Sequence, residues 1–531
     1  MIVHADVRTM DAAHPHATAI AITGTTITYV GDDASPLIGP HTEVHDLGGH
    51  SVTPGLVDAH CHVYGLGVDL ESVDLRGMAS EQAAAAAVIE AAKHVPAGEW
   101  VLGRGWDQNR WPGQSFPGHD SIDAIDRPVV LTRIDGHAIW VNSAALKAAG
   151  VTNNTQNPPG GKVIRKLSSP TGVFVDNAMA LIVGAMPVPS DEVRERRLRA
   201  GLSKLPAVGL TGIHDMGLPR ETIAVLDKLA AAGQLPVHVY AYLLGDPAHP
   251  PTDSPKPAIG RFEMRGVKFF ADGALGSRGA RLYADYDDDP GNRGLWVTEP
   301  ATLARGVEGA VAHGWQVATH AIGDAAVGAV LDAYLAAEKA HPGDLRLRVE
   351  HVQILAPQDE PKLVAAHVVA SIQPTHATSD MPWAEARIGK VRIKGAYAWR
   401  KMLALGVPFA AGSDFPVESI SPLLGIYAAV TRQDADGKPP GGWYPDQRMS
   451  LDEAIAAFTR GAAYASFAED HRGMIAVGFE ADLTTYDRAL SPTNLRDLAV
   501  ELTIVDGKVA YQHAHDAPPH AETAEGFGGD D

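Results

Sequence analysis

The chain has 531 residues, 45% of them hydrophobic, and its 64 acidic and 44 basic residues give a formal net charge of −20 at pH 7. This length exceeds one simple core and suits a large barrel with additional domains. The acidic balance argues against a nucleic-acid or anionic-membrane partner, and the single cysteine, Cys61, excludes an intramolecular disulfide.

No segment has the character of a signal peptide or a membrane span. The first residues, MIVHADVRTMDAAHPH, lack both a basic start and a continuous apolar stretch. No uninterrupted apolar run approaches the roughly 18 residues that a bilayer span needs. We therefore expect a soluble, cytoplasmic protein.

Both ends of the chain have the pattern of short β-strands. Residues 1–52 alternate apolar and polar positions, as in ATAIAITGTTITYVG, and residues 473–512 return to the same pattern. We expect the two ends to meet in one small β-domain, which would cover edge strands that are otherwise exposed. Residues 513–531 cannot form a core and are predicted to be a disordered tail.

Residues 53–472 alternate short apolar runs with stretches of helical composition. Alternation of this kind favours a parallel sheet, and eight strands form a (β/α)8 barrel. About 145 residues, 64–208, are too many for one crossover and are predicted to form an insertion over the catalytic rim of the barrel. The eight expected strands are GLVDAH, TGIHDM, VHVYAYLL, GVKFF, QVATH, LRVEH, VVASIQP and FAAGSD.

Residues that can bind a metal end several of these strands. Positions i and i+2 of a strand face the same side, so His60 and His62 can bind one ion while Cys61 points away as a packed neighbour. Imidazole nitrogen and carboxylate oxygen are both good zinc ligands. His320, His351 and Asp414 end later strands, and parallel strands bring their ends to one rim. The sequence therefore predicts a metal site at that rim.

Lys268 lies inside the apolar strand GVKFF, where an unpaired lysine is rare. Its head could reach an acidic neighbour such as Asp272. Alternatively, a lysine with a depressed pKa could react with carbon dioxide to give a carbamate, an anion able to bridge two metals. The residues alone leave both interpretations open.

Several motifs, taken together and in order, resemble the amidohydrolase superfamily, in the branch that contains N-substituted formamide deformylase (amidohydrolase family 3, YtcJ-like). The similarity runs from about residue 2 to residue 510. It is carried by PGLVDAHCH, GRGWDQNRW, RIDGHAIWVNSAAL, GVKFFADGALGSRGA, THAIGDAAV, RVEHVQ and SIQPTHATSDMPWA.

The resemblance implies a (β/α)8 barrel with a small β-sandwich built from both termini, and a homodimer. It implies that His60, His62 and Asp414 bind the more buried metal. It places His320 and His351 at the second, and Lys268, carboxylated, as the bridge between them. We expect zinc, as two ions or as one.

Two metals would share a water, lower its pKa and hold it as hydroxide for attack on a carbonyl. Asp414 is the candidate general base; the alternative is that it serves only as a ligand. We expect hydrolysis of a C–N bond in a small-molecule substrate, which would be a linear amide, N-acyl or N-formyl compound. A deaminase is the nearest rival, although THAIGDA lacks the glutamate that deaminases place there. Ester or lactone hydrolysis, and a non-catalytic binding or regulatory role on an inherited barrel, stay open.

Six further residues could contact the substrate. Histidines in polar, strand-end contexts suit hydrogen bonds to it, and an arginine could clamp a carboxylate. Tryptophans could line an apolar pocket. Each also has an ordinary structural interpretation, in the core, on the surface or in orienting local backbone. The six are His137, Arg278, His376, Trp106, Asp272 and Trp383.

Overall fold

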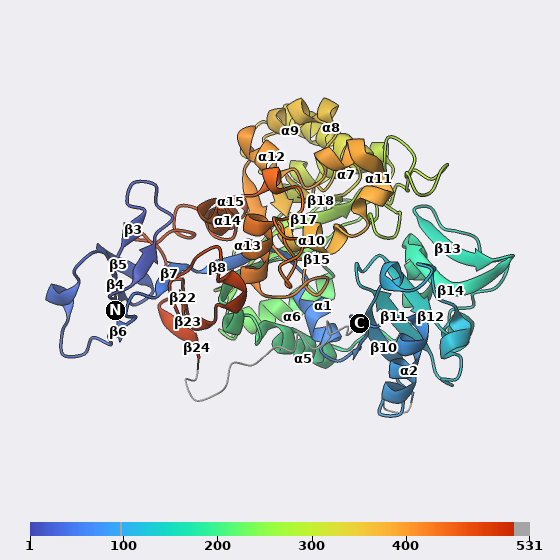
Figure 1. The fold of residues 1–531 in the computed structure, drawn as a ribbon, viewed down its shortest axis with the longest axis horizontal. Coiled ribbons are helices and arrows are strands. Elements are labelled where there is room, and N and C mark those ends of the chain that lie inside the picture. The colour runs from blue at the N-terminus through green and yellow to red at the C-terminus, as the bar shows by residue number, and fades with distance from the viewer. Residues whose placement is uncertain (96–97, 514–531) are drawn as a thin grey trace.

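The computed structural model of the protein describes residues 1–95 and 98–513. The predicted tail lies outside these ranges, apart from residue 513. In Figure 1 a central barrel lies between the terminal strands on the left and an inserted sheet on the right. Within the described ranges, no helix combines the length and the apolar character that crossing a bilayer requires.

Eight strands form one parallel sheet in the order β8-β15-β16-β17-β18-β19-β20-β21, and each neighbouring pair is parallel. Each of the eight predicted segments overlaps one of them, so the predicted barrel is confirmed. Their bounds are β8 Leu56–Cys61, β15 Leu210–Leu218, β16 His238–Leu244, β17 Phe262–Phe270, β18 Gln316–Ala321, β19 Arg348–His351, β20 Val369–Ile372 and β21 Phe409–Ala411.

Helices cover the outside of this sheet. In α6 (Arg220–Ala231), Ile223, Leu226 and Leu229 are buried, at the spacing of one helix face. The others are α7 Pro300–Ala312, α8 Asp324–Ala340, α9 Glu360–Ala365, α10 Pro374–Asp380, α11 Ala384–Arg392, α12 Trp399–Ala404, α13 Pro422–Thr431, α14 Leu451–Ala457 and α15 Arg460–Ala465.

The barrel is closed between β8 and β21 by individual contacts rather than by a strand ladder. Asp58 accepts hydrogen bonds from the backbone N–H and the hydroxyl of Ser413. The backbone N–H of Asp414 donates to the His60 carbonyl at 2.7 Å, and that of His62 donates to Phe415 at 2.9 Å. This seam, formed by residues 58–62 and 413–415, carries three of the predicted metal ligands.

The residues between β8 and β15 contain a separate six-stranded sheet in the order β13-β14-β12-β11-β10-β9. In the same segment of the chain, Ser80 and Ser190 cap helices α2 and α5 by accepting a backbone hydrogen bond. The strands are β9 Val73–Asp74, β10 Val101–Trp106, β11 Val129–Arg133, β12 Ala138–Val141, β13 Gly161–Lys166 and β14 Ser169–Asp176. The helices are α1 Val63–Asp69, α2 Glu81–Ala92, α3 Ser143–Ala148, α4 Ala180–Val183 and α5 Asp191–Leu202.

Strands from both ends of the chain share one sheet, because β22 pairs with β7 in the order β24-β23-β22-β7-β2-β3. A four-stranded sheet, β5-β4-β1-β6, shares an apolar cluster with it that includes Ile20, Val52 and Leu483. The bounds are β1 Ile2–Val3, β2 Asp6–Arg8, β3 His16–Ala17, β4 Ala19–Thr23, β5 Thr26–Gly31, β6 His45–Asp46, β7 Ser51–Pro54, β22 Leu483–Tyr486, β23 Val500–Val505 and β24 Lys508–Gln512.

Candidate metal centre

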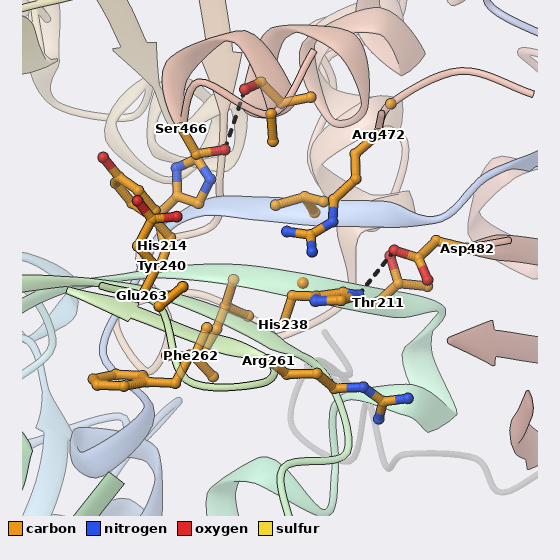
Figure 2. Close-up of a pocket in the computed structure, with 18 of the residues that line it drawn as sticks. Thr211, His214, His238, Tyr240, Arg261, Phe262, Glu263, Ser466, Arg472 and Asp482 are labelled. Atoms are coloured by element: carbon orange, nitrogen blue, oxygen red, sulfur yellow. Dashed lines mark hydrogen bonds and ion pairs between the residues drawn. The ribbon is translucent and has the colours of Figure 1, made fainter. Parts of the chain in front are cut away.

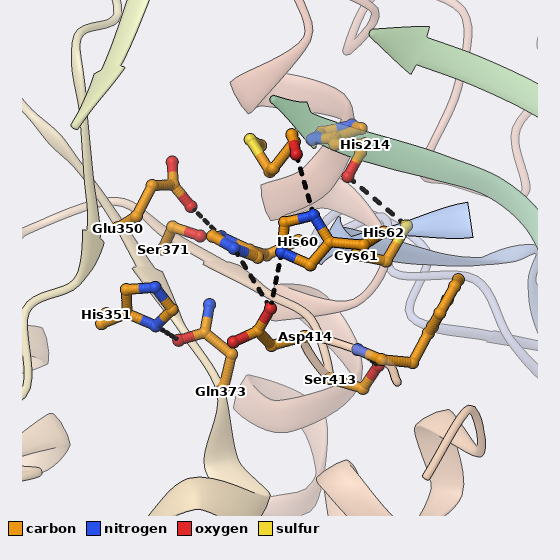
Figure 3. Close-up of polar contacts among 12 residues, drawn as sticks. His60, Cys61, His62, His214, Glu350, His351, Ser371, Gln373, Ser413 and Asp414 are labelled. Carbon is orange, nitrogen blue, oxygen red and sulfur yellow. Dashed lines mark hydrogen bonds and ion pairs between the residues drawn. The ribbon is translucent and has the colours of Figure 1, made fainter. Parts of the chain in front are cut away.

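The strand-end residues converge at the carboxyl end of the barrel. One potential ligand atom each of His60, His351 and Asp414 lies within 4.8 Å of the others, and all three side chains are buried. The His320 ring centroid lies 4.6 Å from that of His351. Figure 3 shows His60, His62 and His351 grouped around Asp414. The five predicted histidine and aspartate ligands thus come from β8 and the residue after it, from β18 and β19, and from the residues after β21.

Three of the imidazoles are oriented by an oxygen atom at Nδ1. His60 Nδ1 lies 2.5 Å from Glu350 Oε2, and His62 Nδ1 lies 2.8 Å from the Met216 carbonyl. His351 Nδ1 lies 2.8 Å from Gln373 Oε1. An acceptor at one ring nitrogen fixes the tautomer and leaves the lone pair of the other nitrogen for a metal.

The residues present fit a metal ion. Asp414 Oδ1 lies 3.0 Å from His62 Nε2 and 3.5 Å from His60 Nε2. It nevertheless has no hydrogen-bond partner among the described residues. Two ring nitrogens and a carboxylate oxygen thus approach one another without hydrogen-bonding geometry, as ligands around a shared cation do.

The protonation states also suit metal binding. Burial, reinforced by the nearby Lys268 ammonium, lowers the pKa of His60 to about 4. Burial likewise lowers the pKa values of His320 and His351 well below the ordinary value. Burial alone would raise the pKa of Asp414, but His60 and His62 hold it below its usual range. Neutral imidazoles and an ionised carboxylate are the forms that coordinate metals.

Lys268 is 1% exposed on β17. Burial lowers its pKa to about 8, against the opposing effect of Glu350 and Asp414. Asp272 does not take up its ammonium, because the Asp272 carboxylate accepts backbone hydrogen bonds from Arg281, Ile322 and Gly323. Of the two interpretations, the buried amine of depressed pKa fits better than the pair with Asp272.

Backbone strain is present at the same place. His351 has φ of +72° and Asp414 has φ of +64°, in the left-handed region that favours glycine. Non-glycine residues in this region cost free energy and concentrate at functional sites. Both residues leave extended geometry where their strands end, so that their side chains turn toward the common centre.

His137 and His376 lie beside the ligands. The His137 ring lies 5.0 Å from that of His320, and its Nδ1 lies 2.7 Å from Asp176 Oδ1 at the end of β14. Asp176 overcomes the effect of burial and raises the pKa of His137 to about 9. His376 Nε2 lies 3.6 Å from Asp414 Oδ2 and has no hydrogen-bond partner among the described residues.

The side chains of the other substrate candidates are engaged in contacts within the protein. Arg278 is paired with Asp288 at 3.0 Å, and Asp272 orients backbone as described. The Trp383 ring is covered by the Arg387 guanidinium at 5.5 Å. Trp106 has no exposed surface and packs against Trp111 and Trp140 in the core of the insertion, and its indole N–H donates to the Leu131 carbonyl.

Comparisons with known proteins agree with this architecture. Residues 43–511 match the amidohydrolase family. YtcJ of Bacillus subtilis (strain 168) is 34% identical over 488 residues, with 89% of this chain and 91% of YtcJ covered. N-substituted formamide deformylase of Arthrobacter pascens is 28% identical, with 96% and 98% covered. The crystal structure of an uncharacterized metal-dependent hydrolase from Pyrococcus horikoshii OT3 has a TM-score of 0.75 and 27% identity, with 92% and 97% covered.

Proposed function

The chain belongs to the amidohydrolase family and is a metal-dependent hydrolase, and we propose that it cleaves a C–N bond in a linear amide, N-acyl or N-formyl compound. The observation that carries this proposal is the buried Lys268 of depressed pKa beside converging, neutral histidines. The relative named N-substituted formamide deformylase supports the same class of bond.

We assign His60, His62 and Asp414 to one zinc ion, and His320 and His351 to a second, with a carbamate on Lys268 between them. One ion held by His60, His351 and Asp414, whose ligand atoms lie within 4.8 Å, is the alternative. When bound, the metal supplies a water of lowered pKa and polarises the carbonyl that is attacked. The homodimer and the cytoplasmic location stay predictions of the sequence.

Asp414 is suited to move the proton. Its Oδ1 faces His60 and His62, whereas its Oδ2 faces His376 at 3.6 Å. The two oxygens can therefore have different roles, Oδ1 as the metal ligand and Oδ2 as the general base. In our proposal Oδ2 takes the proton of the attacking water and passes it to the leaving nitrogen.

His137 and His376 would position the substrate. The Asp176 carboxylate fixes His137 Nδ1, so that the other ring nitrogen of His137 is free for the substrate. His376 Nε2 is buried and without a partner among the described residues, as expected of a group that binds a ligand atom. Both lie beside proposed ligands, which is where the scissile carbonyl must be held.

Hydrolysis assays would test the reaction class. The zinc-loaded protein should cleave N-formyl and N-acyl amines faster than matched esters or aminopurines. Asp414→Asn should lower kcat by about 100-fold or more, because general acid–base catalysis contributes 10²–10⁴. Asp436→Asn, in an exposed loop, is the control. Undiminished amide hydrolysis by Asp414→Asn would show that the reaction does not take place at this site. Preferential turnover of the aminopurines would favour the deaminase.

A further inference from the structure

A second group of metal-ligand side chains lies at the opposite, amino-terminal end of the barrel. His238, the first residue of β16, borders a cavity of about 200 Å³ there, together with Asp482, which precedes β22. Glu480 precedes Asp482 by two residues, and Asp506 lies in the turn between β23 and β24. This barrel-floor cluster (His238, Glu480, Asp482 and Asp506) joins the barrel to the sheet formed by both chain ends.

His238 Nε2 faces three carboxylates. It lies 3.1 Å from Asp482 Oδ2, 3.4 Å from Asp506 Oδ1 and 3.7 Å from Glu480 Oε2. Figure 2 shows the His238 ring directed toward Asp482. The residue is only 8% exposed, yet neither of its ring nitrogens has a hydrogen-bond partner among the described residues.

These distances match those between ligands around a metal. A single N–H group donates to one acceptor and cannot satisfy three oxygens. Around a tetrahedral zinc with ligand bonds of about 2.1 Å, neighbouring ligand atoms are roughly 3.4 Å apart, the middle of the range seen here. We propose that the barrel-floor cluster binds one divalent cation of the zinc type through His238, Asp482 and Glu480, whose ligand atoms all lie within 4.8 Å of one another, with Asp506 Oδ1 beside them at 3.4 Å from His238 Nε2.

The charged groups of the cluster and its neighbours have a net negative charge, which favours a cation. Arg261 Nε donates to the far oxygen of Asp506, and Arg472 Nε donates to Glu480 Oε2, the oxygen that also faces His238 Nε2. The other oxygen of Asp482 accepts a hydrogen bond from the backbone N–H of Asp506. Three carboxylates and two guanidiniums leave one net negative charge facing the imidazole. Asp506 Oδ1 and Asp482 Oδ2 remain directed at Nε2.

A proton competes for the same nitrogen. Burial lowers the pKa of His238, but Asp482 and Asp506 outweigh burial and raise it above the ordinary value. A cation must displace that proton, so occupancy should increase as the pH rises. Because the cluster shares no residue with the metal centre, it would act as a structural bond between β16 and the terminal sheet.

Zinc stoichiometry tests the proposal. Full-length protein is loaded with zinc at pH 8, freed of excess metal by gel filtration and analysed by elemental spectrometry. We expect His238→Gln to hold one equivalent per chain fewer than the wild type. His471→Gln is the matched control, because His471 borders the same cavity and reaches Glu480 only at 3.8 Å; it should hold the wild-type amount.

Two further measurements make the test decisive. The equivalent assigned to the cluster should be retained in His60→Ala/His62→Ala, which separates this site from the metal centre, and should be lost on transfer to pH 6. If His238→Gln does not fold, Asp482→Asn replaces it with the same expectation. Equal zinc content in the wild type and the folded cluster variant would overturn the proposal and leave a proton as the occupant.

Discussion

At the metal centre, Glu350 determines how His60 presents its ring. Its Oε2 contacts His60 Nδ1, and both of its oxygens accept hydrogen bonds from Arg348. Burial would raise the pKa of Glu350, but Arg348 and His60 hold it well below the ordinary value. An ionised acceptor at Nδ1 raises the basicity of the imidazole and directs Nε2 toward the metal.

We therefore predict that Glu350→Gln weakens zinc binding by about 10- to 100-fold, the usual loss when a partner of a metal-bound histidine is changed. A neutral amide keeps the size of the side chain but accepts a weaker hydrogen bond. Competition with a chromophoric chelator measures the change. Glu195→Gln, which affects only an exposed pair with Arg199 on α5, is the control. Equal zinc affinity in Glu350→Gln and wild type would show that Glu350 does not orient the ligand.

The convergence of the proposed histidine and aspartate ligands could be predicted from the sequence, whereas the contact of Glu350 with His60 could not. These histidines and Asp414 end apolar runs, which is a local pattern. Strict alternation on LRVEH places Glu350 and His351 on opposite faces of the strand. The structure departs from alternation because His351 has φ of +72°, so both side chains reach the barrel interior. A backbone change at one residue has no signature in a single sequence.

At the scale of elements, the interior of the barrel is unusually polar. Tyr240 and Tyr242 of β16 both donate to Gln316 Oε1 of β18. The guanidinium of Arg348 on β19 donates hydrogen bonds to the Tyr242 hydroxyl and to the Glu350 carboxylate. It also contacts Nδ1 of His214, which lies on β15. Barrel interiors are more often filled by branched apolar residues. The eight strands could be predicted because their apolar runs are local, but the pairing of polar groups across the barrel depends on register.

The loop after β17 positions the insertion against the barrel. A methyl group on Gly273 would lie 2.5 Å from Asp176 Oδ2, and one on Gly279 would lie 2.6 Å from the same atom. Asp176, which holds His137, therefore enters a space that only glycines leave open. The contact joins residues about 100 positions apart, so the Gly-rich run DGALGSRG could be recognised as a motif without its partner being predictable.

Gly273→Ala should displace Asp176 and with it His137, while the metal ligands keep their places. Because a displacement of about 1 Å can cost 100-fold in rate, we expect kcat for the amide to fall by 10- to 100-fold with zinc content unchanged. Gly118→Ala, whose added methyl group meets nothing within 4 Å, should retain full activity. Loss of zinc together with activity would instead show that Gly273 is needed to position the metal ligands.

At the scale of the whole molecule, the candidate metal centre lies where the two ends of the barrel sheet meet. Seven strand pairs are joined by parallel ladders, whereas β8 and β21 are the two ends of the sheet. Across that seam the contacts include those of Asp58 with Ser413 and of the His60 carbonyl with Asp414. His60 and His62 lie on one side of the seam and Asp414 on the other, so a shared metal would bond the two sides together.

Removal of the metal should therefore loosen the barrel at the seam first. Metal at about 1,000 times its dissociation constant stabilises a folded protein by about 4 kcal/mol, and here that free energy is applied between β8 and residues 409–415. We expect chelation to increase hydrogen exchange in these two segments more than in β16 and β17, whose mutual ladder is long. His60→Ala should show the faster exchange at the seam with or without zinc. An equal increase over all eight strands would mean that the metal stabilises the barrel without joining its ends.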